Sequence, residues 1–243
     1  MPEPRDYALK TENAKLSGHE AEEAFSGYGV MGLPFASGHV LGLRRFPASS
    51  VGPGYYSVWH RDPDGDWTFY SDVDPLNSCI RYFGAAVIGF RHAEIKVGWP
   101  GPRRLTVDMP SEDFHWEVTV TATPVTRTLN TIGGVIPDSL WHSRRFLGVM
   151  SRMVGPMLRA GRVNLAGHVP NQQAYIANPR LIWLVQSSTA RLADTDFGEP
   201  GPLKQQAFLG DFAIPQRGVL AVGQAYFEPF DAGKHLAVAS KSG

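Results

Sequence analysis

Short runs of apolar and β-branched residues alternate with clusters of Gly, Pro, Asp and Asn along most of the chain. Such runs, separated by turn-forming residues, are typical of β-strands. No regular alternation of strands with helices occurs, so an all-β, antiparallel fold is expected rather than a parallel sheet. The predicted strand segments are residues 27–33, 39–46, 55–72 (a hairpin), 80–90, 93–99, 104–109, 114–123, 162–169, 173–177, 181–190 and 218–228.

The hairpin at 55–72, YYSVWHRDPDGDWTFYSD, turns at the sequence DPDG, residues 62–65. Proline at the second position and glycine at the fourth favour a type I turn. If these four residues form the loop, alternation predicts one mainly apolar face. Its members are Tyr56, Val58, His60, Trp67 and Phe69. Tyr70 and Asp72 then lie on the opposite face, and a bulge at the turn would change this sorting.

Two later strands use their faces differently. Residues 114–123 alternate, so Phe114 and Trp116 share one face while His115 and Glu117 share the other. The segment LIWLVQ at 181–186 is apolar on both faces. We therefore expect it to be covered on both sides.

One long helix is predicted over about residues 138–160 to cover the sheet. Leu140, Leu147 and Val154 recur every seven residues, and Arg145, Arg152 and Arg159 follow the same period. The pair Gly155-Pro156 should kink this helix near Arg152. Two interpretations remain: a helix packed on the sheet with solvated arginines, or a movable lid or membrane-surface contact.

The strands and the helix together favour a barrel or a strongly curved sheet that holds one small ligand. We expect a polar N-terminal arm (1–25), one β-barrel domain (26–230) with the inserted helix 138–160, and a C-terminal tail (231–243).

Composition narrows the class of protein. The chain of 243 residues carries 23 basic and 23 acidic residues, so the basic surface of a nucleic-acid-binding protein is not expected. Cys79 is the single cysteine, which suits a reducing compartment. No run of apolar residues is long enough for a transmembrane segment, and a cytoplasmic protein is expected.

Three segments resemble a known group of barrels: the aromatic hairpin, CIRYFG at 79–84, and GHVPNQQAYIANPRLIWLVQ at 167–186. The chain resembles the calycin-type, lipocalin-like barrels that include the carotenoid hydratases and the lipocalin-like cyclases. This resemblance implies the barrel architecture and a hydrophobic substrate. The Gly-x-Trp signature of lipocalins is absent, and no functional residue is carried over.

Four residues are candidates for catalysis. His60, surrounded by apolar side chains, would have a lowered pKa and act as a neutral base, or it is a core histidine with one hydrogen bond. His115 and Glu117 point the same way and could form an acid–base pair, or they belong to a solvated face. Arg81 could hold a carboxylate or enolate oxygen.

The predicted substrate-binding residues are mostly aromatic. They are Tyr56, Trp67, Phe69, Tyr82, Trp116, Trp141, His168 and Trp183. No histidine pair has metal-ligand spacing and no glycine-rich nucleotide motif follows a strand, so neither a metal nor another cofactor is expected.

Three functions remain open at this stage. The first is a cofactor-independent enzyme that uses acid–base chemistry on a small hydrophobic substrate, by hydration, isomerisation or cyclisation. The second is a non-catalytic carrier or sensor of a hydrophobic molecule. The third is a structural interaction protein, which a fully packed barrel interior would favour. The expected partner is that small molecule, and a homodimer is the assembly considered.

Overall fold

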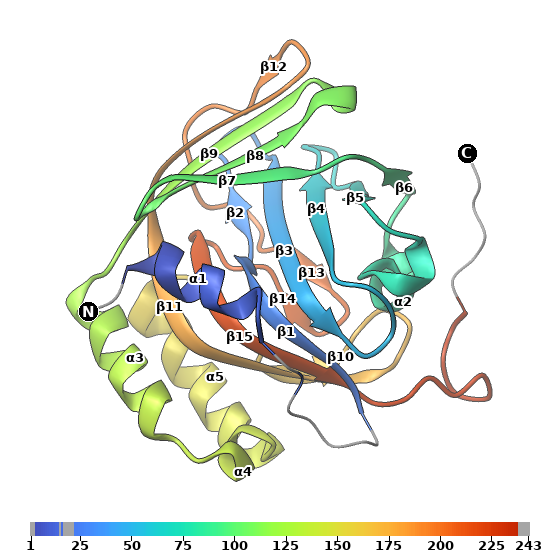
Figure 1. Ribbon diagram of the computed structural model, residues 1–243, viewed down its shortest axis with the longest axis vertical. Coiled ribbons are helices and arrows are strands. Elements are labelled where there is room, and N and C mark those ends of the chain that lie inside the picture. Colours follow the sequence, from blue (N-terminus) through green and yellow to red (C-terminus); the bar gives the residue numbers. More distant parts are fainter. Residues whose placement is uncertain (1–2, 15, 17–21, 238–243) are drawn as a thin grey trace.

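A curled β-sheet with helices packed against its two faces forms the body of the molecule (Figure 1). The computed structural model describes residues 3–14, 16 and 22–237. The strands are β1 (Glu23–Val30), β2 (Leu33–Pro34), β3 (Val40–Ser49), β4 (Tyr55–Arg61), β5 (Trp67–Ser71), β6 (Gly89–His92), β7 (Lys96–Gly101), β8 (Arg104–Met109), β9 (Phe114–Thr121), β10 (Ala166–His168), β11 (Ala174–Leu192), β12 (Thr195–Asp196), β13 (Phe208–Leu209), β14 (Phe212–Ala213) and β15 (Val219–Phe227). The α-helices are α1 (Pro4–Thr11), α2 (Ile80–Phe83), α3 (Pro124–Val135), α4 (Asp138–Trp141) and α5 (Arg144–Leu158), and short 3-10 helices are η1 (Pro75–Asn77), η2 (Gly84–Ala86) and η3 (Pro110–Glu112).

The sheet is mixed rather than wholly antiparallel. Its strands follow the order β6-β5-β4-β3-β1-β15-β11-β9-β8-β7, and β5 pairs with β6 in parallel. A parallel pair needs a crossover connection, and here η1, α2 and η2 supply it. The segment 80–90, predicted as one strand, is therefore helical up to Ala86 and only ends as β6. The fold is mostly β with several helices.

The sheet curls so strongly that its edge strand β7 comes close to β1, a strand in the middle of the sheet order. The rings of Trp99 on β7 and Tyr28 on β1 lie 6.1 Å apart, although four strands separate β7 from β1 in the sheet order. The order ends in β6 and β7, which do not pair with each other in the described sheet. Of the two architectures expected, the strongly curved sheet is confirmed, and it is an open half-barrel.

The inner face of this curl is filled by side chains. Leu43, Val58, Trp116, Trp183 and Leu220, from five different strands, belong to one buried cluster. The α1 helix packs against the same cluster, where Ala8 is fully buried and Tyr7 contacts Trp183 at 5.8 Å between ring centroids. The interior of the curled sheet, where the sequence analysis predicts a ligand, is thus filled by a packed core.

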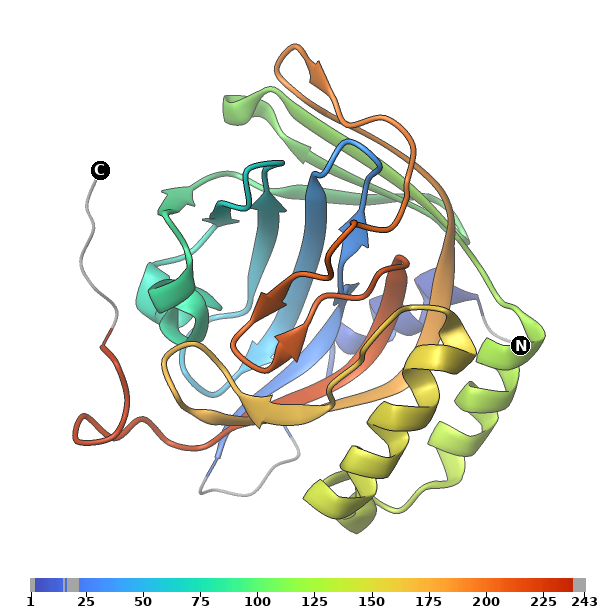
Figure 2. The same ribbon diagram turned by 180° about the vertical axis from the view of Figure 1, so that it is seen from behind.

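The outer face of the sheet carries a second layer. Seen from behind, the β13–β14 hairpin crosses the sheet between α2, in teal, and α5, in yellow (Figure 2). Tyr55, Trp59 and Phe69 pack here with Tyr82 and Phe83 of α2. Both cavities described below lie in this layer.

The β4–β5 hairpin has a register that differs by one residue from the predicted one. His60 pairs with Thr68, and Trp59 pairs with Phe69. Gly65 has a φ of +107° and adds a third residue to the loop between Asp62 and Asp66, whose backbones are hydrogen-bonded at 3.0 Å. Because a shift of one residue exchanges the faces of a strand, the predicted sorting is wrong. Trp67 and Phe69 lie on the outer face, while Tyr70 shares the inner face with His60.

The predicted long helix is two helices, and a further helix precedes them. The break falls at His142–Ser143, where the Ser143 hydroxyl caps α5. Leu158 of α5 packs against the sheet, which favours the first of the two interpretations of this segment. No helix among the described residues is long and apolar enough to cross a membrane.

The unpredicted helix α3 explains how the segment 181–186 is covered on its outer side. Asn130 of α3 donates from Nδ2 to the Ile182 carbonyl at 3.0 Å and accepts from the Ile182 N–H at 2.8 Å. Ile182 and Leu184 lie on this side, and Trp183 and Val185 on the inner side. The prediction that the strand is covered on both faces is confirmed.

Candidate functional site

The first cavity lies on the outer face of the sheet, beneath α2 and the β13–β14 hairpin, and has a volume of about 90 Å³. This is several times the roughly 10–15 Å³ that one enclosed water needs. Small residues on adjacent strands leave the space open: Gly27 and Gly223 are register partners, and Ala221 and Ala225 flank Gly223 on the same strand face. A Cβ atom at Gly27 would lie 1.9 Å from the Arg45 carbonyl oxygen, so the close approach of β1 and β3 requires glycine there.

Aromatic side chains form most of the remaining wall of this cavity. They are Phe25, Phe46, Tyr55, Trp59, Tyr82, Phe83, Tyr175, Phe212 and Phe227. Such a wall suits an apolar ligand with few polar atoms.

Arg44 of β3 places a buried positive charge in this cavity. Its side chain donates to the carbonyl groups of Val30 and Leu43 from Nη1, at 2.6 and 2.9 Å, and to Met31 from Nη2 at 3.0 Å. The guanidinium lies 4.2 Å from the centroid of the Trp59 ring. None of the ion pairs among the described residues involves Arg44.

Burial lowers the pKa of Arg44 to about 10, so the guanidinium still carries its charge at neutral pH. The arginine is only 4% exposed. A buried charge is normally paired because its desolvation is costly. Carbonyl dipoles and the Trp59 ring compensate Arg44 in part, and no carboxylate of the described chain completes the pair.

Two weak acids lie beside Arg44. The Tyr55 hydroxyl is 3.2 Å from the Cys79 sulfur, and both residues are buried and line the cavity. Burial raises the pKa of Cys79 to about 11 and raises the pKa of Tyr55 well above its ordinary value. Both groups are therefore protonated at neutral pH and can donate a hydrogen bond or a proton.

Asn178 adds an unsatisfied acceptor to the same wall. Its side-chain oxygen is buried and has no hydrogen-bond partner within the described part of the chain. The residue is 1% exposed and lines the first cavity. A buried acceptor of this kind can take a hydrogen bond from a water molecule or from a donor group of a ligand.

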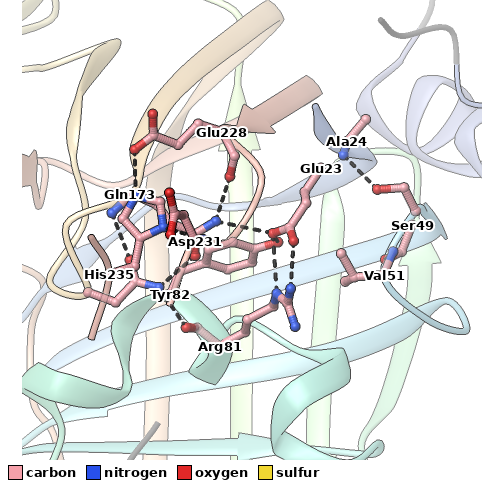
Figure 3. A network of polar contacts seen from close by, with 12 residues as sticks. Glu23, Ala24, Ser49, Val51, Arg81, Tyr82, Gln173, Glu228, Asp231 and His235 are labelled. Atoms are coloured by element: carbon pink, nitrogen blue, oxygen red, sulfur yellow. Dashed lines mark hydrogen bonds and ion pairs between the residues drawn. The ribbon is translucent and has the colours of Figure 1, made fainter. Parts of the chain in front are cut away.

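A polar network fixes the wall of the cavity at α2 (Figure 3). The Glu23 carboxylate accepts from Arg81 Nη2 at 2.6 Å, from the Tyr82 hydroxyl at 2.6 Å and from Gln173 Nε2 at 3.3 Å. The Tyr82 ring stacks on Phe227 at 3.9 Å. Burial alone would raise the pKa of Glu23, but the hydrogen bonds from Arg81 and Tyr82 outweigh it, and the pKa is lowered.

The same network reaches the end of β15 and the segment after it. Gln173 Nε2 also donates to the Glu228 carbonyl at 2.5 Å, and Glu228 Oε1 lies 2.8 Å from His235 Nε2. Arg81, predicted to hold a ligand oxygen, is thus bound to the carboxylate of Glu23 and positions α2.

A second cavity of about 100 Å³ lies between the sheet and the helices α3 and α5. Leu129, Val154 and Leu158 line it from the helices, and Ile182 and Val219 from the strands. Trp141 of α4 also lines it, and the Trp141 indole N–H is buried with no hydrogen-bond partner among the described residues.

Of the predicted site residues, Tyr82 lines the first cavity and Trp141 lines the second. Trp67 and Phe69 lie on the outer face near the first cavity but pack behind Trp59 in the core. Trp116 and Trp183 belong to the packed core of the inner face, and the Trp116 indole donates to Ser188 at 2.9 Å.

The histidine candidates lie away from both cavities. His60 Nε2 is 3.0 Å from His39 Nδ1, and both rings stack on Phe197. Burial, and then the nearby His39, lower the pKa of His60 to about 4, which confirms the predicted direction. His168 is exposed and lies 3.4 Å from Asp211.

His115 and Glu117 do point to the same side of β9, but that side is open. His115 is bonded to Asp108 at 2.7 Å and Glu117 is paired with Arg104 at 3.1 Å. Tyr56 lies on the inner face, where its ring contacts the Arg45 guanidinium at 4.3 Å. The structure does not bring these residues to the cavity that contains Arg44.

Sequence reasoning missed Arg44, Tyr55, Cys79 and Asn178. A signal for Arg44 was present in HVLGLRRF, residues 39–46. Leu41 and Leu43 occupy one face of this strand, so alternation sends Arg44 to the other face with Val40 and Phe46. A charged residue between two apolar ones on a strand face marks a candidate ligand site. In the part of the chain that the structure describes, no group of three His, Cys, Asp or Glu side chains is placed to hold a metal ion.

Comparisons with known proteins give one structural similarity. No family model matches the chain, and none of the curated proteins matches it by sequence. Among solved structures, the chain is similar to acetoacetate decarboxylase from Legionella pneumophila subsp. pneumophila str. Philadelphia 1, with a TM-score of 0.38 and 10% identity over 95% of each chain. A similarity of this size assigns no residue role to this chain, and the resemblance to carotenoid hydratases and lipocalin-like cyclases stays a prediction.

Proposed function

We propose that this protein binds a small, largely apolar molecule that carries a carboxylate or an enolate, and that Arg44 is the counter-ion of this group. The single observation that carries the proposal is the buried Arg44 guanidinium, which has no carboxylate partner in the described chain and lines an aromatic cavity. An anionic ligand would complete the pairing of this charge in a place from which water is largely excluded.

The surroundings of Arg44 agree with such a ligand. Hydroxyl and thiol donors from Tyr55 and Cys79 lie on the same wall. Both are neutral at physiological pH and so add donors without adding negative charge. The rings of Trp59 and Phe212 would cover the apolar part of the ligand.

Binding is tested by calorimetry with matched pairs of ligands, each an aryl or alkyl carboxylate and its primary amide. Wild-type protein should prefer the carboxylate at least about tenfold, because only the charged ligand pairs with Arg44. Arg44→Met should weaken carboxylate binding by at least about 30-fold. Arg104→Met, which removes an exposed arginine on β8, serves as the matched control.

Two results would refute the proposal. One is equal affinity of wild-type protein for carboxylates and amides. The other is unchanged carboxylate binding in Arg44→Met with circular dichroism like that of wild type. The ligand pair tests the idea in the unaltered protein, so it does not depend on the folding of the variant.

A second candidate function is catalysis, and the Tyr55–Cys79 contact beside Arg44 favours it. The enol would lose its O–H proton to water and leave an enolate paired to Arg44. The O–H bond of Tyr55 would then break, a C–H bond would form at the enolate carbon, and the phenolate would recover through water the proton that the enol released. Arg44 would stabilise the enolate before this transfer. No cofactor takes part in this step.

Catalysis is tested with an aryl enolpyruvate, whose conversion to the keto form is followed by absorbance. An active enzyme should accelerate this conversion, and Tyr55→Phe should lower the rate at least about 100-fold while carboxylate binding persists. Tyr70→Phe, a buried tyrosine on the inner face, is the control. If wild-type protein gives no acceleration, this catalytic role is refuted and binding remains the function.

A further inference from the structure

We infer that the ligand is a long-chain carboxylate, whose apolar chain runs from Arg44 through a passage between the two cavities and ends beneath α3 and α5. This inference rests on the proposed function and specifies the class of ligand. Its basis is that the two cavities are neighbours with shared lining residues, and that one of them is lined by a charged residue while the other is lined by none.

The cavities share a wall. Five residues line both of them: Met31, Ala177, Pro179, Phe212 and Ala221. Ala177 of β11 and Ala221 of β15 are small residues, and Pro179, which pairs with Gly223, lies between them along the β11–β15 pair. Met31 and Phe212 have the large side chains at this boundary. A methionine adapts its shape readily, and Phe212 belongs to the short β13–β14 hairpin rather than to the main sheet.

The second cavity has the chemistry of a site for an apolar chain. None of the residues that line it is charged. Of its two asparagines, Asn130 is bonded to the β11 backbone through both side-chain atoms, and Asn164 donates to the Asp211 carbonyl at 2.7 Å. Leu129, Val154 and Leu158 supply the helical wall.

The first cavity, by contrast, has its charge near the shared wall. Arg44 donates to the Met31 carbonyl, and its guanidinium lies 5.7 Å from the centroid of the Phe212 ring. A carboxylate bound to Arg44 is thus close to the residues that form the passage. Its chain then has an apolar space of about 100 Å³ beyond them.

The test is a series of straight-chain saturated carboxylates from four to fourteen carbons, measured by calorimetry. Each methylene that enters the second cavity should improve the dissociation constant about threefold to fourfold. Val154→Trp should fill the second cavity and remove this gain for long chains, while the affinity for butyrate stays unchanged. Val149→Trp adds the same ring to the exposed side of α5, where Val149 is 54% exposed, and should retain the gain.

A second measurement needs no variant to fill the cavity. A fatty acid with bromine on its last carbon should quench the fluorescence of Trp141, and Trp141→Phe should abolish this component of quenching. The isomer with bromine on the carbon beside the carboxylate should leave the fluorescence of Trp141 unquenched, because its bromine would lie in the first cavity.

The outcomes separate this inference from the proposed function. Short carboxylates that bind through Arg44 with an affinity that does not rise with chain length would overturn the long-chain inference. Equal behaviour of Val154→Trp and Val149→Trp would overturn it as well. In both cases the proposed binding of an anion at Arg44 stands. Terminal bromine that leaves Trp141 unquenched overturns the long-chain inference as well. If no carboxylate of any length binds wild-type protein better than it binds the Arg44→Met variant, both ideas fail together.

Discussion

Two adjacent arginines of β3, Arg44 and Arg45, point to opposite faces of the sheet and have different partners. Arg45 points to the inner face, where its Nε donates to Glu12 of the N-terminal segment at 3.0 Å and Tyr56 covers its guanidinium. Arg44 points to the outer face and has only carbonyl and ring partners. Arg45 is thus paired with a carboxylate of the chain on one side of the strand, whereas Arg44, on the other side, has no carboxylate partner among the described residues.

The histidine pair on the inner face predicts a pH dependence of stability. In the folded protein the pKa of His60 is about 4, below the ordinary value of 6.5, because of burial and the nearby His39. Between these values the unfolded chain binds more protons, so stability is full above pH 6.5 and is lost as the pH falls toward 4. The loss should be about 2–3 kcal/mol over this window.

Urea unfolding at pH values from about 5 to 7 measures this slope. In His60→Phe the decline of stability with falling pH should be clearly smaller than in wild type. His115→Gln, which changes an exposed histidine, should leave the decline as it is. Equal slopes in wild type and His60→Phe would show that His60 is not the source.

At the level of the elements, one glycine determines the pairing of β4 with β5. Gly65 adopts a left-handed conformation with a φ of +107° and lengthens the loop by one residue. That residue moves Trp67 and Phe69 to the outer face, where they support Trp59 behind the first cavity. A loop shorter by one residue would send the same aromatic side chains into the packed inner core.

Substitution of two glycines by alanine should change stability in opposite directions. Gly65→Ala should destabilise the protein by about 1–2 kcal/mol, because alanine is strained at this φ and its Cβ would lie 3.0 Å from Arg61 Nη2. Gly148→Ala in α5 should stabilise it by about 0.5–1 kcal/mol, since no atom beyond the adjoining residues and backbone of its own helix lies within 4 Å of the added methyl group. Chemical denaturation of both variants measures the pair, and a stabilising Gly65→Ala would contradict the loop described for β4–β5.

For the molecule as a whole, the curl of the sheet separates two environments. Its inner face encloses a buried apolar cluster that includes Ala8 of α1. Figure 1 shows α1 lying across this face. The outer face carries α2, α3, α5 and the β13–β14 hairpin (Figure 2). The two cavities lie between these elements and the sheet. The N-terminal segment, expected as a polar arm, therefore contributes to the core through α1.

The packing of α1 is tested by two neighbouring substitutions. Ala8 is fully buried and Leu9 is 48% exposed. Ala8→Asp should destabilise the protein by about 3 kcal/mol or more, because it places a carboxylate in the apolar core. Leu9→Asp should change the stability by less than about 1 kcal/mol. Small and equal effects in urea unfolding would mean that α1 does not cover the core.

The sequence pattern predicts one of the two long helical segments and not the other. α3 begins with Thr123, Pro124 and Thr126, which form a capping box with proline at the first helical position. Its threonines and two glycines hide the helical period, so the segment was not predicted as a helix. In the predicted helix 138–160, Leu147 and Val154 face the interior as the period predicts, but Leu140 is 41% exposed because α4 ends at Trp141 and interrupts the helix.

The sequence by itself determined that the chain forms a mostly β structure, that strand 114–121 has one buried face, and that segment 181–186 is covered on both sides. These features follow from the local alternation of apolar and polar residues within each strand. Only the tertiary structure decided which face of the sheet is solid and which is hollow, because that depends on the direction of the curl and on Gly65. It also decided that Arg44, Tyr55, Cys79 and Asn178 line the same cavity. These four residues come from four separate parts of the chain, and no local pattern records that they lie close together.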